Sequence, residues 1–159
     1  MTISTGFGGA VVIDKKIYRG STNLGGYFPR LILDGKNTAD SLISGKSLHE
    51  EAKKKIDDNI KNTVELFELY GSGNEKAKEI VENFKLYLTA ALLNISATIN
   101  PDIIILGGGV LKSKEYFLED VKKEFKNMAH KLAKDTRIEV TDLDEPGLLG
   151  ACLIAKYVS

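Results

Sequence analysis

Short runs of apolar residues, broken by glycine, open the chain. Residues 2–5 have a β-prone composition and end at a glycine turn, residues 10–13 form a second apolar run, and residues 17–19 follow a polar turn. This pattern predicts three short, successive strands that pair in antiparallel order. Residues 21–46 contain Gly, Asn, Asp and Pro at irregular intervals, so they predict irregular structure.

Apolar residues recur every three or four positions in two long central segments. In residues 48–70, which follow Ser47 as a candidate N-cap, this spacing predicts one helix that ends at the glycine-rich residues 71–73. Residues 75–99 carry a clearer apolar stripe that predicts a second helix. Its second half is almost wholly apolar, so we expect its C-terminal end to be deeply buried.

The rest of the chain alternates between strand and helix patterns. The apolar run 103–106 is typical of a central strand that is buried on both faces. Residues 114–133 predict a helix, residues 137–140 alternate like a strand, and a last helix follows residue 146. The predicted order is β-β-β-α-α-β-α-β-α, so the expected fold class is α/β, and residues 1–159 suffice for a single domain.

A cluster of glycines lies where the first predicted strand turns into the second. Thr5, Gly6, Gly8 and Gly9 surround one phenylalanine there. Glycines let backbone N–H groups point into one space without a Cβ in the way, and the threonine hydroxyl adds a donor. The segment is therefore a candidate site for nucleotide phosphates, although a glycine-rich hairpin without a ligand explains the same residues equally well.

A second cluster, Gly107, Gly108 and Gly109, follows the predicted buried strand directly. The carboxyl ends of such strands are where α/β sheets bind ligands. Three glycines would let a flat group such as adenosine approach the backbone closely. A tight strand-to-helix turn is the better explanation of this cluster alone, but two glycine-rich strand ends in one domain favour a nucleotide.

Composition and charge exclude several classes of partner. Lys and Arg total 22 and Asp and Glu total 22, with an isoelectric point near 6.7, which argues against a nucleic-acid or anionic-membrane surface. The single cysteine, Cys152, excludes an intramolecular disulfide and a multi-cysteine zinc cluster. With no apolar run long enough for a membrane span and no signal-like start, the expected location is the cytoplasm.

Familiar nucleotide and metal motifs fail on inspection. The sequence Gly45-Lys46-Ser47 ends like a P-loop, but Asp40 stands where that motif requires glycine. Neither glycine cluster has the GxGxxG spacing of a dinucleotide-binding fold. His49 and His130 are expected to be surface side chains on helices rather than metal ligands.

Three blocks of the sequence resemble the ROK family of sugar kinases and repressors. Residues 3–9 with 17–20 resemble its signature region, residues 100–110 its adenosine segment, and residues 146–151 its closing helix. The blocks occur in the family's order over nearly the whole chain. The resemblance implies a ribonuclease-H-like domain of the actin-like ATPase superfamily, namely the C-terminal, nucleotide-binding half. It also implies ATP or ADP with Mg as the ligand, a sugar as a further ligand, and a homodimer.

The chain departs from the family's pattern in two places. The resemblance implies an N-terminal half with a DxGGT phosphate loop and the aspartate that acts as general base, and neither is found here. Tyr27 and Arg30 stand where the family has the glutamate and histidine that hold sugar hydroxyls, and the cysteine-rich zinc loop is missing. We therefore expect no structural zinc, and Tyr27 and Arg30 as the candidate sugar-side residues.

Three hypotheses for the function follow. The chain is the nucleotide-binding half of a ROK-like sugar kinase, not catalytically competent alone and completed by a separate N-terminal half-chain. Alternatively, it is a degenerate ROK-like regulatory or ligand-binding protein without kinase activity. The third hypothesis is a scaffold that keeps only the fold and an oligomer surface.

Overall fold

The computed structural model describes residues 1–131, 133–141, 143 and 146–158 of the chain. At its centre, β5 (Ile103–Leu106) pairs in parallel with β6 (Arg137–Val140), which confirms the two strands that the sequence predicts there. β1 (Thr2–Ile3) extends this sheet along the opposite edge of β5. The backbone N–H of Ile3 donates to the carbonyl of Gly107 at 2.7 Å, and that of Gly107 to the carbonyl of Met1 at 2.9 Å.

The predicted run of three antiparallel strands is replaced by two separate hairpins. β2 (Phe7–Gly8) pairs antiparallel with β1, because a tight turn at residues 4–6 reverses the chain before the apolar run begins. β3 (Val12–Ile13) and β4 (Lys16–Ile17) form the second hairpin. Its two-residue turn has positive φ at both positions, which matches the twist of the flanking strands.

The predicted helix over residues 48–70 is wrong, because the structure divides this stretch. α2 (Gly45–Lys55) follows the short α1 (Ala39–Ile43), and α3 (Thr63–Gly71) starts after a seven-residue break. Ser44, rather than Ser47, caps α2, since its side chain accepts from the backbone N–H of Ser47. Asn62 caps α3 by accepting from the N–H of Glu65 at 3.1 Å.

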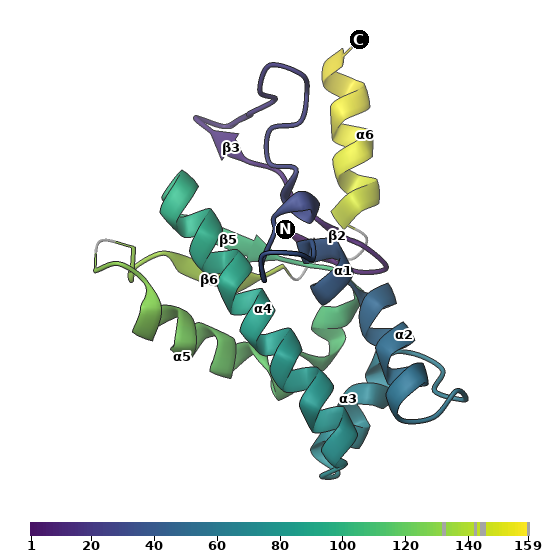
Figure 1. Cartoon of the computed structure of the whole chain (residues 1–159). Coiled ribbons are helices and arrows are strands. Elements are labelled where there is room, and N and C mark those ends of the chain that lie inside the picture. The colour runs from purple at the N-terminus through teal and green to yellow at the C-terminus, as the bar shows by residue number, and fades with distance from the viewer. Residues whose placement is uncertain (132, 142, 144–145, 159) are drawn as a thin grey trace.

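α4 (Glu75–Ile99) is the long central helix that the apolar stripe predicts, and it crosses in front of β5 and β6 (Figure 1). Its N-terminal two-thirds are packed in the core, but the expected burial of its C-terminal end is wrong for the last turn. Ile99 there is 36% exposed. The last helical turn therefore leaves apolar surface beside the sheet.

The predicted helix over residues 114–133 is also divided. A 3₁₀ segment, η2 (Gly109–Tyr116), leads through Phe117 into α5 (Leu118–Met128), and residue 132 lies outside the described residues. A last helix, α6 (Pro146–Val158), confirms the prediction after residue 146 and projects from the same end of the molecule as β3 (Figure 1). With η1 (Phe28–Arg30), these elements make an α/β fold.

An aromatic cluster joins α3, α4 and η2 in the core. The rings of Phe84 and Phe117 meet edge to face with centroids 5.0 Å apart, and Phe67 lies 5.4 Å from Phe117. On the sheet, Ile104 and Leu106 face this core and are buried. Ile105, which points to the opposite face of β5, is 49% exposed. The expected burial of this strand on both faces is therefore wrong, because one face of the sheet is packed and the other is open.

Candidate functional site

The turn between β1 and β2 presents unpaired donors to solvent. Thr5 and Gly6 are exposed, and the N–H of Ser4 closes the turn by donating to the carbonyl of Gly6 at 2.9 Å. Within the part of the chain that the structure describes, no partner is found for the backbone N–H groups of Thr5 and Gly6 or for the Thr5 hydroxyl. Three donors are therefore free to hold an anion.

The first residues of α2 fix the direction of these donors. The N–H groups of Gly45 and Lys46 donate to the carbonyls of Ser4 and Thr5, at 2.7 and 3.1 Å. In a planar trans peptide the C=O and the following N–H point in opposite directions. Because both carbonyls point into α2, the N–H groups of Thr5 and Gly6 point away from it.

Gly45 has to be glycine for this contact. A Cβ on Gly45 would lie 2.6 Å from the carbonyl oxygen of Ser4, so any side chain would push α2 off the turn. The sequence comparison with a P-loop rejects Gly45-Lys46-Ser47 as a direct phosphate site. In the structure the backbone N–H groups of Gly45 and Lys46 instead hold the turn that carries the free donors.

A carboxylate holds the far side of the same turn. Oδ1 of Asp40, on α1, accepts the backbone N–H of Phe7 at 2.7 Å across 33 positions of sequence. Asp40 is half-buried, and the Phe7 ring lies in the core. The sequence contains no local signal for this contact, because Asp40 falls in the stretch that lacks any period.

The second glycine cluster, residues 107–109, packs against β1 and Ser4, directly before the first cluster. A Cβ on Gly108 would lie 2.5 Å from the carbonyl oxygen of Ile3, and Gly109 lies next to Ser4, with its Cβ position 3.8 Å from the serine Oγ. Gly107 is buried, with the methyl of Thr141 at 2.8 Å from its Cβ position. The two predicted glycine segments are thus adjacent, and Gly109 is the one that faces open space.

The glycines that follow the turn differ in their surroundings. A Cβ on Gly8 would meet nothing within 4 Å, whereas one on Gly9 would lie 2.6 Å from the ring of Phe28. Gly9 is therefore explained by packing against η1. Packing does not explain why position 8 is glycine, since the space beside its Cα is open. That space could hold a ligand next to β2.

The structure does not join the candidate sugar-side residues to the glycine segments. Tyr27 and Arg30 are both exposed, on and just before η1, which packs against β2 and α1. Among the described residues no hydrogen bond or ion pair connects either side chain to the Thr5 turn or to residues 107–109. Their assignment to a sugar stays a prediction.

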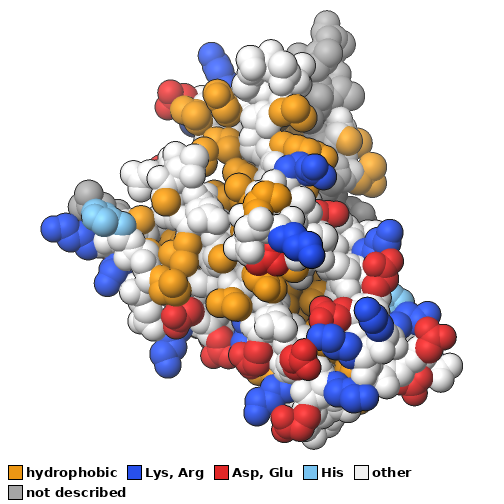
Figure 2. Space-filling view, in the orientation of Figure 1, with side chains coloured by type: hydrophobic (Ala, Val, Ile, Leu, Met, Phe, Trp, Pro, Cys, Tyr) orange, Lys and Arg blue, Asp and Glu red, His pale blue; other side chains and the backbone are white. Residues whose placement is uncertain are grey.

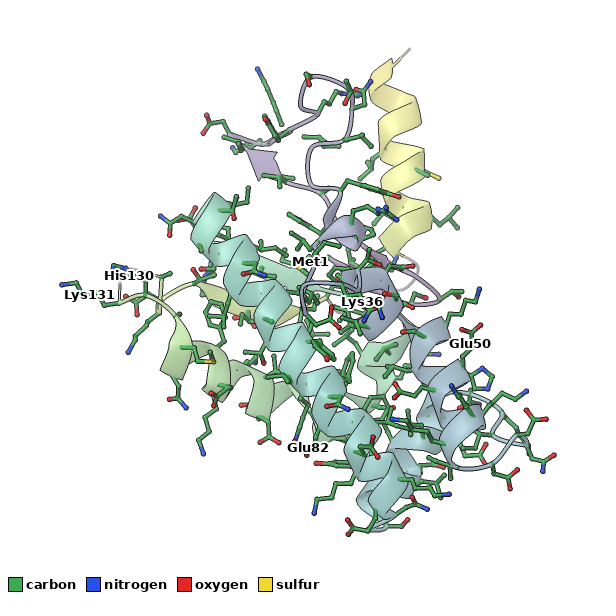
Figure 3. The ribbon with its side chains drawn as sticks, in the orientation of Figure 1. Met1, Lys36, Glu50, Glu82, His130 and Lys131 are labelled. Carbon is green, nitrogen blue, oxygen red and sulfur yellow. The ribbon has the colours of Figure 1, made fainter. Side chains whose placement is uncertain are left out.

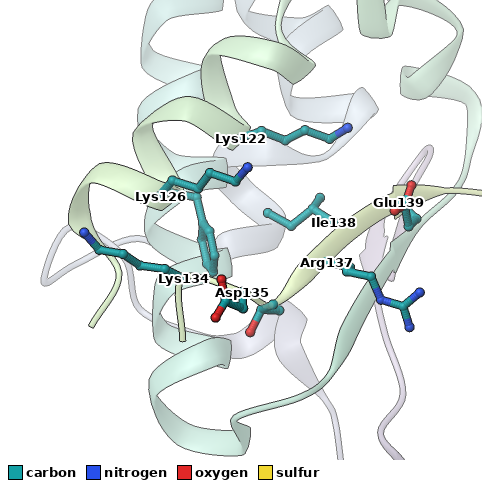
Figure 4. Close-up of a pocket in the computed structure, with 9 residues that line it drawn as sticks. Lys122, Lys126, Lys134, Asp135, Arg137, Ile138 and Glu139 are labelled. Atoms are coloured by element: carbon teal, nitrogen blue, oxygen red, sulfur yellow. The ribbon is translucent and has the colours of Figure 1, made fainter. Parts of the chain in front are cut away.

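Two hollows of the described structure lie beside the Thr5 turn or away from it. A groove of about 830 Å³ runs along the open side of the β-structure, from the β3 strand past Met1 to Ile105. Met1 is labelled at the middle of the molecule in Figure 3, where β1 begins. A smaller hollow of about 320 Å³ lies between α5 and β6 (Figure 4). Gly8 and Gly9 line the larger groove, whereas Thr5, Gly6 and residues 107–109 line neither hollow, so the Thr5 turn and Gly109 form one open wall rather than an enclosed cleft.

The hollow between α5 and β6 has mixed charge. Lys122, Lys126, Lys134 and Arg137 line it together with Asp135 and Glu139, and in Figure 4 the Arg137 side chain points away from the three lysines. Lys122 is paired with Glu119 at 3.3 Å. These cations do not converge on one point, so we assign no ligand to this hollow.

The described residues contain no group of three or more His, Cys, Asp or Glu side chains that could hold a metal ion. Cys152 is exposed on α6. His49 is half-buried and its Nε2 lies 2.7 Å from the carbonyl oxygen of Ile60, so it joins α2 to the break before α3. No helix among the described residues has the length and apolar character needed to cross a membrane.

Comparison with known proteins gives one consistent result. The family model described as "ROK family" matches residues 1–158. The chain is 28% identical over 125 residues to an N-acetylmannosamine kinase of Vibrio vulnificus, covering 73% of this chain and 42% of that protein. It is 25% identical over 169 residues to a xylose repressor of Lactiplantibacillus pentosus, covering 99% of this chain and 42% of the repressor.

A solved structure agrees with the sequence comparison. The crystal structure of a ROK hexokinase from Thermus thermophilus superimposes with a TM-score of 0.79 at 27% identity. The match covers 96% of this chain and 55% of the hexokinase. The chain thus spans about half the length of the relatives it matches.

Proposed function

Because the chain belongs to the ROK family and has the actin-like ATPase fold of the ROK hexokinases, we propose that it is the nucleotide-binding half of an ATP-dependent sugar kinase. In this proposal residues 1–159 form one domain that lies in the cytoplasm. The phosphates of ATP or ADP with Mg bind at Thr5, Gly6, Gly8 and Gly9, and the adenosine binds at Gly107, Gly108 and Gly109.

The free donors of the Thr5 turn are the observation that carries this proposal. The N–H groups of Thr5 and Gly6 point away from α2, and their direction is fixed because α2 donates to the carbonyls of the same two peptides. The exposed Thr5 hydroxyl is a third free donor. Preorganised N–H groups stabilise anionic phosphate oxygens without reorganising when the ligand binds. The bound nucleotide supplies the phosphoryl group, and the turn holds and orients its oxygens.

Residues 1–26, which carry the proposed phosphate turn, offer no suitable group for the other requirement of phosphoryl transfer. A kinase needs a carboxylate that accepts the proton of the sugar hydroxyl. Asp14 is the one carboxylate in residues 1–26, and it lies in the exposed turn of the β3–β4 hairpin. We therefore propose that this polypeptide alone does not phosphorylate a sugar.

Two exposed apolar surfaces support an interaction with a further polypeptide. The open groove is bordered by Val12, Ile13 and Ile105, and α6 exposes Leu148 and Leu153. Figure 2 shows hydrophobic side chains gathered around the β3–β4 hairpin and the loop that follows it, whereas charged side chains prevail over α2 and α3. We propose that an N-terminal ROK half covers the groove, and that the protein forms homodimers.

Titration calorimetry with Mg-ADP tests the nucleotide site. We expect Thr5→Val to weaken binding about tenfold, since it removes one donor to a charged group. Gly109→Leu should abolish binding, because its side chain would enter the space proposed for adenosine. Thr98→Val, which removes an exposed hydroxyl from α4, is the matched control and should bind like the wild type. Equal affinity in all four proteins would refute the site.

A second function is favoured by the residues on η1 and by one relative. Tyr27 and Arg30 replace the sugar-binding glutamate and histidine that the family resemblance implies, and arginine has no hydrogen-bond acceptor. The xylose repressor matches nearly the whole chain. In this alternative the chain binds a sugar or nucleotide and regulates without kinase activity. Mixing it with an N-terminal ROK half separates the two functions, because only a kinase half gains turnover.

A further inference from the structure

We infer that Asp40 is the positioning residue of the phosphate turn, setting its affinity for nucleotide phosphates without touching the ligand. This inference rests on the proposed function. It extends it by giving a role to a residue outside both glycine clusters. The contact that carries it is the hydrogen bond from the Phe7 N–H to Asp40 Oδ1, at 2.7 Å.

Three successive peptide planes of the turn are held in place. α2 holds the Ser4–Thr5 and Thr5–Gly6 peptides by their carbonyls, through the N–H groups of its first two residues. The Gly6–Phe7 peptide is held at both ends: its N–H donates to Asp40, and its carbonyl accepts from Ser4 at 2.9 Å. Asp40 supplies the one side-chain contact among these restraints, so substitution there loosens a single plane.

The absence of a side chain at position 6 lets the carboxylate approach. A Cβ on Gly6 would lie 3.3 Å from Asp40 Oδ1, closer than an ordinary contact. Gly6 does not have a positive φ, so its backbone conformation does not itself require glycine. The close approach of Asp40 therefore explains why position 6 is glycine, and a substitution at one of the two positions is expected to affect the other.

The carboxylate acts through geometry rather than charge. A hydrogen bond to an ionised acceptor is among the stronger ones, which suits a restraint on an exposed turn. The negative charge itself lies on the same turn as the proposed phosphates and would repel them. An asparagine at position 40 keeps an acceptor oxygen and removes the charge, so it separates the two effects.

Binding of Mg-ADP and of adenosine to a set of variants tests this role. We expect Asp40→Ala to weaken Mg-ADP about tenfold and to leave adenosine within about twofold of the wild type. Asp40→Asn should bind Mg-ADP at least as well as the wild type. The matched control is Asp34→Ala, which removes an exposed carboxylate that also accepts backbone N–H groups, from Lys36 and Asn37, and should change neither affinity.

Hydrogen exchange of the Phe7 amide gives a readout that needs no nucleotide. It should speed up in Asp40→Ala, return toward the wild-type rate in Asp40→Asn, and stay unchanged in Asp34→Ala. If the wild type fails to bind Mg-ADP, the proposed function is wrong, and the Phe7 exchange rate still decides whether Asp40 holds the turn. An unchanged rate in Asp40→Ala, or equal losses of Mg-ADP and adenosine, would overturn the inference.

Gly6→Ala by itself covers the case in which Asp40→Ala is poorly folded, and together the two variants form a double-mutant cycle that tests the coupling. The added methyl should displace the carboxylate and weaken Mg-ADP by a similar factor. In the Asp40→Ala background the same methyl should have little further effect, because neighbours that share a contact are not additive. Fully additive losses would show that Gly6 and Asp40 act independently and would overturn the coupling.

Discussion

Gly108 lies directly over the backbone of Ile3, where a Cβ would come within 2.5 Å of the carbonyl oxygen and 2.9 Å of the nitrogen. Its φ of 103° is also one that residues with a side chain rarely adopt. We expect Gly108→Ala to destabilise the fold by about 3 kcal/mol, through backbone strain and overpacking. Chemical denaturation followed by circular dichroism measures this change.

Gly109→Ala is the matched control for that prediction. Its Cβ would find its nearest neighbour at 3.8 Å, and its φ is not positive. The stability of this variant should stay within about 1 kcal/mol of the wild type. Equal stability losses at the two positions would contradict the packing argument, and a change at position 108 is accordingly a poor test of nucleotide binding.

Lys85 joins three helices and should make stability depend on alkaline pH. Its ammonium, on a side chain only 12% exposed, lies 2.6 Å from Glu82 and 2.8 Å from Asp120. Burial lowers the pKa of Lys85, but the hydrogen bonds that its ammonium donates to Asp120, Glu82 and Tyr70 outweigh burial and raise the pKa above its ordinary value. We expect Lys85→Met to lose about 1–2 kcal/mol at pH 7.

The direction of the pH effect follows from that raised pKa. The stabilisation is fully present below the pKa of an unfolded lysine, about 10.4, and is lost as the pH rises through the higher folded value. Urea unfolding at pH 7, 9 and 11 should show an unchanged advantage of the wild type over Lys85→Met at pH 7 and 9, and a smaller one at pH 11. A constant difference across this range would contradict the assignment.

The open groove should cause self-association in the absence of an N-terminal half. Val12 is 62% exposed beside it, so Val12→Asp should leave the fold intact and shift sedimentation toward the monomer. Leu86→Asp is the control, because Leu86 is 59% exposed on α4 and does not line the groove. A wild type that sediments as a monomer at high micromolar concentration would refute the prediction.

The chain alone should not turn over any hexose or N-acetylhexosamine. Removing a general base by itself costs about 10²–10⁴-fold in rate, and the open glycine site offers one wall where positioning needs two. A coupled ADP-release assay over a panel of sugars measures this, with an added N-terminal ROK half as the second arm. Turnover without that half would contradict the proposal.

The strands β5 and β6 were predictable because their signals are local. Ile104 and Leu106 lie in an unbroken apolar run that is typical of a strand, and glycine follows at once. The divided helix was not predictable. Ile60 keeps helical spacing with its neighbours and is 4% exposed, yet it lies in the break. Ile60 is buried by tertiary packing, and its carbonyl contacts His49 of α2. Its apolar spacing therefore suggests a helix where the structure has a break.

The support of the candidate site was equally hidden. The contact between Asp40 and Phe7 joins positions that no periodicity relates, and Gly45 resembles part of a motif to which it does not belong. Sequence reasoning selected Thr5 and the glycine clusters as candidate ligand-binding residues, since glycine and threonine carry that signal in their chemistry, and this assignment stays a prediction. It missed the residues behind them, whose role depends on how α1 and α2 return to β1.

The pairing of β1 with β5 also has a consequence for how the protein folds. The hydrogen bond from Met1 to the carbonyl of Ile105 closes a loop of 104 positions, whereas the contacts between α3 and α4 join helices that are adjacent in the chain. Closing a flexible loop of this size costs about 4 kcal/mol of chain entropy before the pairing repays it. The helical layer is thus expected to form first and β1 to dock last. Since β1 carries the Thr5 turn up against Gly109, the proposed nucleotide site is assembled only in that final step.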